Sequence, residues 1–212
     1  RVSNFIGYGS GYLSTNAQQS NFLGWSAGGE APNASFSNFM GREAGFSADN
    51  ATDSNFFGAY SGRYADNANN SNFIGGRAGH GAGNASYSNF FGTSAGDGAA
   101  NANNSIFIGY AAGAGDGVNN TGNANDFSIL IGKSTSTGGF SNSIAIGGSA
   151  INTASNQFMI GSTTRPIDTT IWKGSASTEC TLTTGTGVSC TSDERLKKNI
   201  EHLTSDTLDK VL

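Results

Sequence analysis

Apolar side chains occur in the first half of this chain as short clusters at a fixed spacing. The segment Ser-Asn-Phe, followed by one apolar residue and Gly, recurs every 17 residues, and its seventh copy has Ile in place of Asn. These segments begin at Ser3, Ser20, Ser37, Ser54, Ser71, Ser88 and Ser105. A second Gly and an Asn-Ala pair complete the unit S-N-F-h-G-x-x-A-G-x-x-A-x-N-A-x-x, in which h is apolar. This regularity indicates a repeat protein.

The 17-residue period predicts one coil of an all-β, parallel β-solenoid or β-roll. It is shorter than helix-pair repeats of about 33 residues or more, and the Gly and Asn of each unit disfavour a helix. We expect strands on the Ser-Asn-Phe-h-Gly and Ala-x-Asn-Ala segments, with Gly and Asn at corners because they tolerate positive φ. Coils stacked about 4.8 Å apart would align identical residues into ladders. The predicted ladders are Phe5, Phe22, Phe39, Phe56, Phe73, Phe90 and Phe107, and Asn16, Asn33, Asn50, Asn67, Asn84 and Asn101.

The two adjacent apolar residues of each unit predict an association face. Neighbouring residues on a strand point to opposite sides, so one of each pair, such as Phe73 and Ile74, lines the coil interior and the other faces outward. Seven stacked outward residues would form a stripe larger than a monomer normally exposes. We therefore expect a cyclic homo-oligomer. The alternative is a flattened monomer whose coil interior takes both residues through a β-bulge.

Regular repeats occupy residues 1–113, and irregular coils of 14–23 residues at 114–161 are expected to continue the same solenoid. Because the chain begins inside a repeat, we also expect further coils before it. The segment 142–150, N-S-I-A-I-G-G-S-A, resembles the repeat of trimeric autotransporter adhesin heads. That resemblance implies a left-handed β-roll with three chains packed side by side, and hence a homotrimer.

Residues 162–192 are predicted to form a connector that contains a β-hairpin. Cys180 and Cys190 flank a segment that has the alternating residue pattern of β-strands and contains Gly at the expected turn. Two cysteines are too few for a structural zinc site. A disulfide between them would fit an extracellular location, and two free thiols are the alternative.

The composition of the chain argues against nucleic acid and membrane as partners. Only 12% of residues are charged and the net charge is −4, which leaves no basic patch for nucleic acid. No apolar run approaches the roughly 18 residues of a membrane span. The 14 Phe and 6 Tyr argue against disorder despite the 32 Gly. We expect neither a nucleic-acid partner nor a membrane span.

The last segment, 193–212, differs sharply because it contains nine charged residues and no Gly. Leu196, Ile200 and Leu203 share one face of an amphipathic helix. We expect a short C-terminal α-helix here. A coiled-coil tail is the alternative, and Thr207 interrupts its apolar stripe.

The segment 192–200, S-D-E-R-L-K-K-N-I, resembles the opening of the intramolecular chaperone autoprocessing domain of phage tail spikes and fibres, including endosialidases. The resemblance implies a helical domain, beginning at 193, that drives trimerisation and then releases itself. It further implies Ser192 as nucleophile and Lys197 as base of a Ser-Lys dyad that cleaves the Ser192–Asp193 bond in the full-length precursor. A base of this kind requires a desolvated, neutral Lys.

Other candidate sites carry weaker signals. Formal glycosylation sequons begin at Asn33, Asn50, Asn69, Asn84, Asn103 and Asn119. Three of them coincide with the Asn ladder, so repeat geometry explains them better. Asp97, Asp116 and Asp126 are candidates for one calcium site near the six extra residues, around 116–120, that delay the strand after the seventh repeat. His80 and His202 have no partners in sequence that would make a metal site or triad, and we expect no cofactor.

These patterns predict a structural extracellular fibre, namely the shaft of a phage tail fibre or of a bacterial surface fibre or adhesin. No activity on an external substrate is expected. One alternative is a tail spike that degrades polysaccharide, which would require carboxylates in a groove between chains. Another is an adhesin that binds a cell-surface glycan or receptor through the residue that follows the first Gly of each unit. Those residues are Tyr8, Trp25, Arg42, Ala59, Gly76, Thr93 and Tyr110.

Overall fold

The computed structural model describes residues 3–117, 127–173, 179–183 and 187–190. They fall into two units, one that ends at Pro166 and one that starts at Ile167. In the described part of the chain every regular element is a β-strand. None of the described residues forms a helix of the length and apolarity needed to cross a membrane. The predicted C-terminal helix at 193–212 lies outside the described residues.

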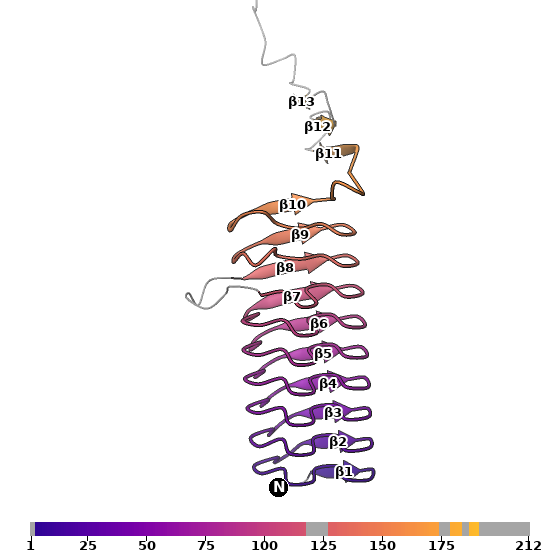
Figure 1. Ribbon diagram of the computed structural model, residues 1–212, viewed down its shortest axis with the longest axis vertical. Coiled ribbons are helices and arrows are strands. Elements are labelled where there is room, and N and C mark those ends of the chain that lie inside the picture. Colours follow the sequence, from indigo (N-terminus) through magenta and orange to yellow (C-terminus); the bar gives the residue numbers. More distant parts are fainter. Residues whose placement is uncertain (1–2, 118–126, 174–178, 184–186, 191–212) are drawn as a thin grey trace, which may run out of the picture. The chain divides into compact units, whose positions relative to one another are not determined.

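The first unit is a stack of coils that contributes one strand per coil to a single parallel sheet (Figure 1). The strands are β1 Asn4–Ile6, β2 Asn21–Leu23, β3 Asn38–Met40, β4 Asn55–Phe57, β5 Asn72–Ile74, β6 Asn89–Phe91, β7 Ser105–Ile108, β8 Ser128–Ile131, β9 Ile144–Ile146 and β10 Phe158–Ile160. Each strand pairs with the strand one coil later, so that Phe56 lies opposite Phe73. The all-β parallel solenoid is therefore confirmed.

The coil differs from the prediction in one respect, because its second strand is absent in the described solenoid. The Ala-x-Asn-Ala segments that were expected to form it are turns. Their Asn residues, Asn16, Asn33, Asn50, Asn67, Asn84 and Asn101, all have φ between 52° and 58°. A strand needs consecutive residues with negative φ, so one left-handed residue per segment ends any strand there.

Backbone hydrogen bonds continue between coils around the turns, even where no strand exists. After β4, alternate residues take positive φ: Gly58 at 134°, Tyr60 at 61° and Gly62 at 60°. The Tyr60 N–H donates to the carbonyl of Arg42 one coil earlier at 2.8 Å, and the Gly62 N–H donates to Ala78 one coil later at 2.8 Å. The alternation of φ therefore points these N–H groups toward the neighbouring coils, whose carbonyl groups accept their hydrogen bonds.

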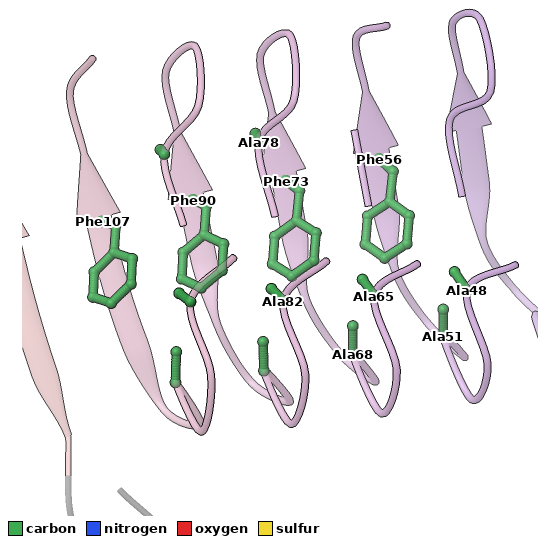
Figure 2. Close-up of a cluster of buried hydrophobic side chains, with 14 of the residues drawn as sticks. Ala48, Ala51, Phe56, Ala65, Ala68, Phe73, Ala78, Ala82, Phe90 and Phe107 are labelled. Atoms are coloured by element: carbon green, nitrogen blue, oxygen red, sulfur yellow. The ribbon is translucent and has the colours of Figure 1, made fainter. Parts of the chain in front are cut away.

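A column of phenylalanines fills the coil interior (Figure 2). From Phe22 to Phe107 each ring is fully buried, and successive ring centroids lie 4.6–4.8 Å apart with nearly parallel planes. Buried alanines occupy the rest of each cross-section. Beyond β7 the column continues with Leu130, Ala145 and Met159. Stacked aromatic pairs contribute about 0.5–1.5 kcal/mol each in addition to the burial of their area.

A column of serines completes the core, and its hydroxyl groups bond both along and across the stack. The Ser37 hydroxyl donates to the carbonyl of Ala51 at 2.6 Å and accepts the N–H of Ser54 at 3.0 Å. Ser37 and Ser54 are fully buried. Because both the donor and the acceptor capacity of this hydroxyl are used, burying it carries little cost.

The second unit contains a three-stranded antiparallel sheet of β11 Thr169–Lys173, β12 Glu179–Thr183 and β13 Gly187–Cys190. Strands β12 and β13 pair in a register that puts Cys180 opposite Cys190. The backbone thus has the hairpin pairing that the sequence predicted for this segment. The disulfide itself stays a prediction.

Candidate functional site

The outward side of the solenoid sheet carries apolar side chains along its whole described length. From β2 to β9 each strand buries its Phe, or the residue in its place, and turns the next residue outward, as the pattern predicted. Leu23 and Met40 are both 42% exposed, for example, and Ile74 is 39% exposed. We call these residues the outward ladder, which consists of Ile6, Leu23, Met40, Phe57, Ile74, Phe91, Ile108, Ile131, Ile146 and Ile160.

A hydrogen-bonded column of strand asparagines runs beside the outward ladder from β1 to β6. The side-chain N–H of Asn21 donates to Oδ1 of Asn38 at 2.7 Å, and the Asn38 N–H donates to Asn55 at 2.8 Å. The same bond joins each successive pair from Asn4 to Asn89. These amides therefore satisfy one another along the stack while they remain at the surface.

At β7 the outward face changes from mixed Asn and apolar residues to apolar residues alone. Ile106 takes the place of the strand Asn and lies opposite Asn89. From there both outward residues of every strand are apolar, and we call this part of the sheet the apolar end. Its members are Ile106, Ile108, Ile129, Ile131, Ile144, Ile146, Phe158 and Ile160. Throughout β1–β10 the outward residues are either Asn or apolar, so this face carries no charge.

A group of charged and aromatic side chains lies along the turn edge, which is formed by the residues that follow each strand. The Arg42 guanidinium lies 5.6 Å from the Trp25 ring and 5.1 Å from the Tyr60 ring. Arg63 lies 4.3 Å from the Tyr64 ring, and its Nε is 2.7 Å from Oε2 of Glu43. That N–H is not aligned for a hydrogen bond, so the contact with the buried Glu43 carboxylate is ionic.

A second ion-paired group lies further along the turn edge. The Arg77 Nε–H donates to Oδ2 of Asp97 at 2.8 Å, and Nδ1 of His80 lies 3.0 Å from Oδ1 of the same carboxylate. The hydrogen bond and the charge of Asp97 raise the pKa of Arg77 above its usual value. His80 and Asp97 are one 17-residue period apart. That spacing was the sequence signal of this pair, and our sequence reasoning missed it.

The acidic residues that were candidates for a calcium site already bond to protein groups. Asp97 bonds Arg77 and His80. Asp116 is buried and accepts hydrogen bonds from the N–H and hydroxyl of Thr137 and from the N–H of Gly139. Asp126 lies outside the described residues. The described ranges contain no group of three His, Cys, Asp or Glu side chains that could hold a metal ion.

The turn asparagines form a ladder of their own. Asn33 donates from its side-chain nitrogen to Oδ1 of Asn50 at 3.1 Å, and Asn67 donates in the same way to Asn84 at 3.2 Å. The sequons at Asn33, Asn50 and Asn84 use amide nitrogens that are donors in this ladder. Repeat geometry therefore accounts for those three sequons.

A hollow of about 410 Å³ lies on the turn edge of the first three coils. It is lined by Tyr8, Gly9, Tyr12, Ser26, Gly29 and Phe46. Of the outer residues predicted to contact glycan, Tyr8 lines this hollow and stacks on Trp25 with ring centroids 6.5 Å apart. Tyr110 lies in a later coil, under the Lys133 ammonium group at 5.7 Å.

The proposed cleavage residues Ser192 and Lys197 lie outside the described residues, as does His202. No known protein family matches the chain. No curated protein matches it either. The surfaces of the solenoid are therefore the guide to its function.

Proposed function

We propose that the chain is the shaft of an extracellular, homotrimeric fibre whose solenoids pack through their outward faces. The β-solenoid fold is compatible with a fibrous or structural protein. Its ten strands, spaced about 4.8 Å apart, give the first unit a length of roughly 43 Å. Inter-coil hydrogen bonds and the Phe column run through the regular coils, which favours a rigid extension over a flexible tether.

The outward ladder is the observation that carries this proposal. A soluble monomer rarely exposes a continuous apolar surface of this length, and the face carries no charge that would oppose contact with a copy of itself. Rotation about an axis parallel to the stack brings the same rung of each chain together, so Phe57 would meet Phe57 of the other copies. Three copies is the number implied by the resemblance of residues 142–150 to adhesin heads.

Light scattering in native buffer tests the oligomer directly. We expect a mass about three times the 21.6 kDa of one chain. A mass near 21.6 kDa would contradict the proposal and favour a monomer with an exposed stripe.

We further propose that a C-terminal chaperone domain, of which 193–212 is the beginning, assembles the fibre and cleaves itself off. In this scheme a neutral Lys197 accepts the proton of the Ser192 hydroxyl as that oxygen attacks the carbonyl carbon of the Ser192–Asp193 bond in a neighbouring copy of the trimer. Lys197 then passes the proton to the Asp193 nitrogen as the C–N bond breaks, and water hydrolyses the ester that is left on Ser192. In the full-length precursor, Ser192→Ala should abolish processing, whereas Ser189→Ala should leave it intact. Unchanged processing in Ser192→Ala would rule out this nucleophile.

The engagement of two carboxylates by arginines favours a shaft over a polysaccharide-degrading tail spike. Glycosidases require a pair of carboxyl groups that are available to the substrate. On the turn edge the Glu43 and Asp97 carboxylates are both engaged by arginines. An extracellular location, on a virion or a bacterial surface, follows from the predicted Cys180–Cys190 disulfide and is proposed with it.

A further inference from the structure

The hollow on the turn edge exists because one coil lacks a side chain that its neighbours have. Gly29 occupies the repeat position that carries Tyr12 one coil earlier and Phe46 one coil later. The next two coils have Arg63 and His80 there. The missing side chain leaves a gap in an otherwise filled row, with an aromatic ring on either side of it.

The floor of the hollow is kept open by glycines. A Cβ on Gly29 would lie 3.0 Å from a ring carbon of Phe46, and a Cβ on Gly9 would lie 3.1 Å from Oγ of Ser26. The Phe46 ring therefore leans over the backbone of the preceding coil. The lining spans three coils, so the hollow runs along the turn edge.

The walls combine apolar ring surfaces with hydroxyl groups. Tyr8 is 79% exposed and Tyr12 is 62% exposed. Their rings contribute apolar surface, while their phenol groups and the Ser26 hydroxyl can donate and accept hydrogen bonds. None of the six lining residues is charged. The volume of about 410 Å³ falls within the range of small-molecule sites.

We propose that this hollow binds a neutral saccharide. A pyranose ring has C–H groups on its faces, which pack on aromatic rings, and hydroxyl groups around its edge, which would meet the phenol and Ser26 hydroxyls. An anionic sugar fits less well because the lining offers no cation. The nearest arginine row, at Arg42 and Arg63, already contacts aromatic rings and Glu43.

The test uses the full chain and a panel of neutral gluco-, galacto- and manno-oligosaccharides. Binding is measured by ligand-observed NMR and calorimetry, with sialylated and sulfated oligosaccharides as the charged arm. We expect a neutral oligosaccharide to bind, and Tyr8→Ala and Tyr12→Ala to weaken that binding at least tenfold. Gly29→His introduces the side chain that occupies the equivalent position three coils later, at His80. It should abolish saccharide binding because the imidazole fills the gap.

The matched control is Tyr87→Ala. Tyr87 is 63% exposed, nearly the same as Tyr12, but lies in a different turn of the coil. This control should bind as the parent chain does. The proposal is overturned if no neutral oligosaccharide binds with a dissociation constant below about 10 mM, if Tyr12→Ala binds unchanged, or if only charged sugars bind. The site needs residues of one chain only, so these outcomes are independent of the light-scattering mass that tests the fibre.

Discussion

Gly62 lies against the ring of Phe56, and a Cβ on Gly62 would lie 2.6 Å from Cγ of that ring and closer still to two other ring carbons. The same relationship joins Gly45 to Phe39 and Gly79 to Phe73. The second Gly of each repeat is therefore fixed by the buried Phe of its own coil. Its positive φ, 60° at Gly62, is a second reason for glycine.

Gly62→Ala should lower the free energy of unfolding by about 2–4 kcal/mol, because overpacking costs about 1–3 kcal/mol and a left-handed Ala adds about 1 kcal/mol. Urea denaturation followed by circular dichroism measures the change. Gly83→Ala is the control, since its Cβ would meet nothing within 4 Å. That substitution should be neutral or stabilising by up to about 1 kcal/mol. Equal losses in the two variants would show that the Phe56 ring is not the cause.

Tyr87→Asn should raise the free energy of unfolding by about 1 kcal/mol, because Tyr87 holds a left-handed conformation with φ 59° that Asn adopts more readily. The equivalent residues in neighbouring coils are Asn70 and Asn104. Thermal and urea denaturation would both report the gain. Tyr110→Asn is the comparison, since Tyr110 is similarly exposed but is not among the residues with positive φ. A gain of the same size there would contradict the backbone explanation.

Asn67 combines a turn conformation with a place in the Asn ladder, and two substitutions separate these roles. Asn67→Gly keeps the left-handed turn but loses the side-chain bonds to Asn50 and Asn84, which should cost about 1 kcal/mol. Asn67→Ala loses the bonds and also strains the turn, which should cost about 2 kcal/mol. Denaturation midpoints give both values. If Ala proved no worse than Gly, the φ of 52° would not matter to stability.

The outward face should associate most strongly at its apolar end. The double variant Ile106→Asn/Ile129→Asn continues the strand Asn column beyond β6 into β7 and β8 and should dissociate the oligomer into monomers that keep the solenoid. Leu23→Asn/Met40→Asn, at the other end, should weaken association less. Light scattering across a dilution series measures assembly, and circular dichroism verifies the fold. Equal dissociation by the two double variants would contradict a dominant apolar end.

Much of the fold could be predicted because the repeat places each residue type in a fixed environment. The spacing of Phe73 and Ile74 was enough to predict a parallel strand with one residue inside and one outside. The prediction of a second strand in each coil was wrong because Asn67 and its equivalents have a left-handed φ. The sequence did not reveal this, since an Ala-x-Asn-Ala segment can form either a turn or a strand. Tyr60 has positive φ without being Gly or Asn, so its residue type gave no sign of the conformation.

The candidate sites were harder to predict because they depend on departures from the repeat. Gly29 matters for the side chain it lacks, and a repeat consensus treats its position as variable. His80 and Asp97 become neighbours only once the coils are stacked in register. The Glu43 contact with Arg63 arises in the same way, between adjacent coils.

The regularity of the strand Asn column has a consequence for alignment between chains. A chain displaced by one coil, about 4.8 Å along the stack, would present almost the same surface to its neighbour from β1 to β6. That half of the molecule cannot distinguish correct alignment from a displaced one. The change from Asn89 to Ile106 breaks this degeneracy, because the boundary occurs at one height only. In copies that pack through this face, the C-terminal coils therefore determine the alignment of the whole stack.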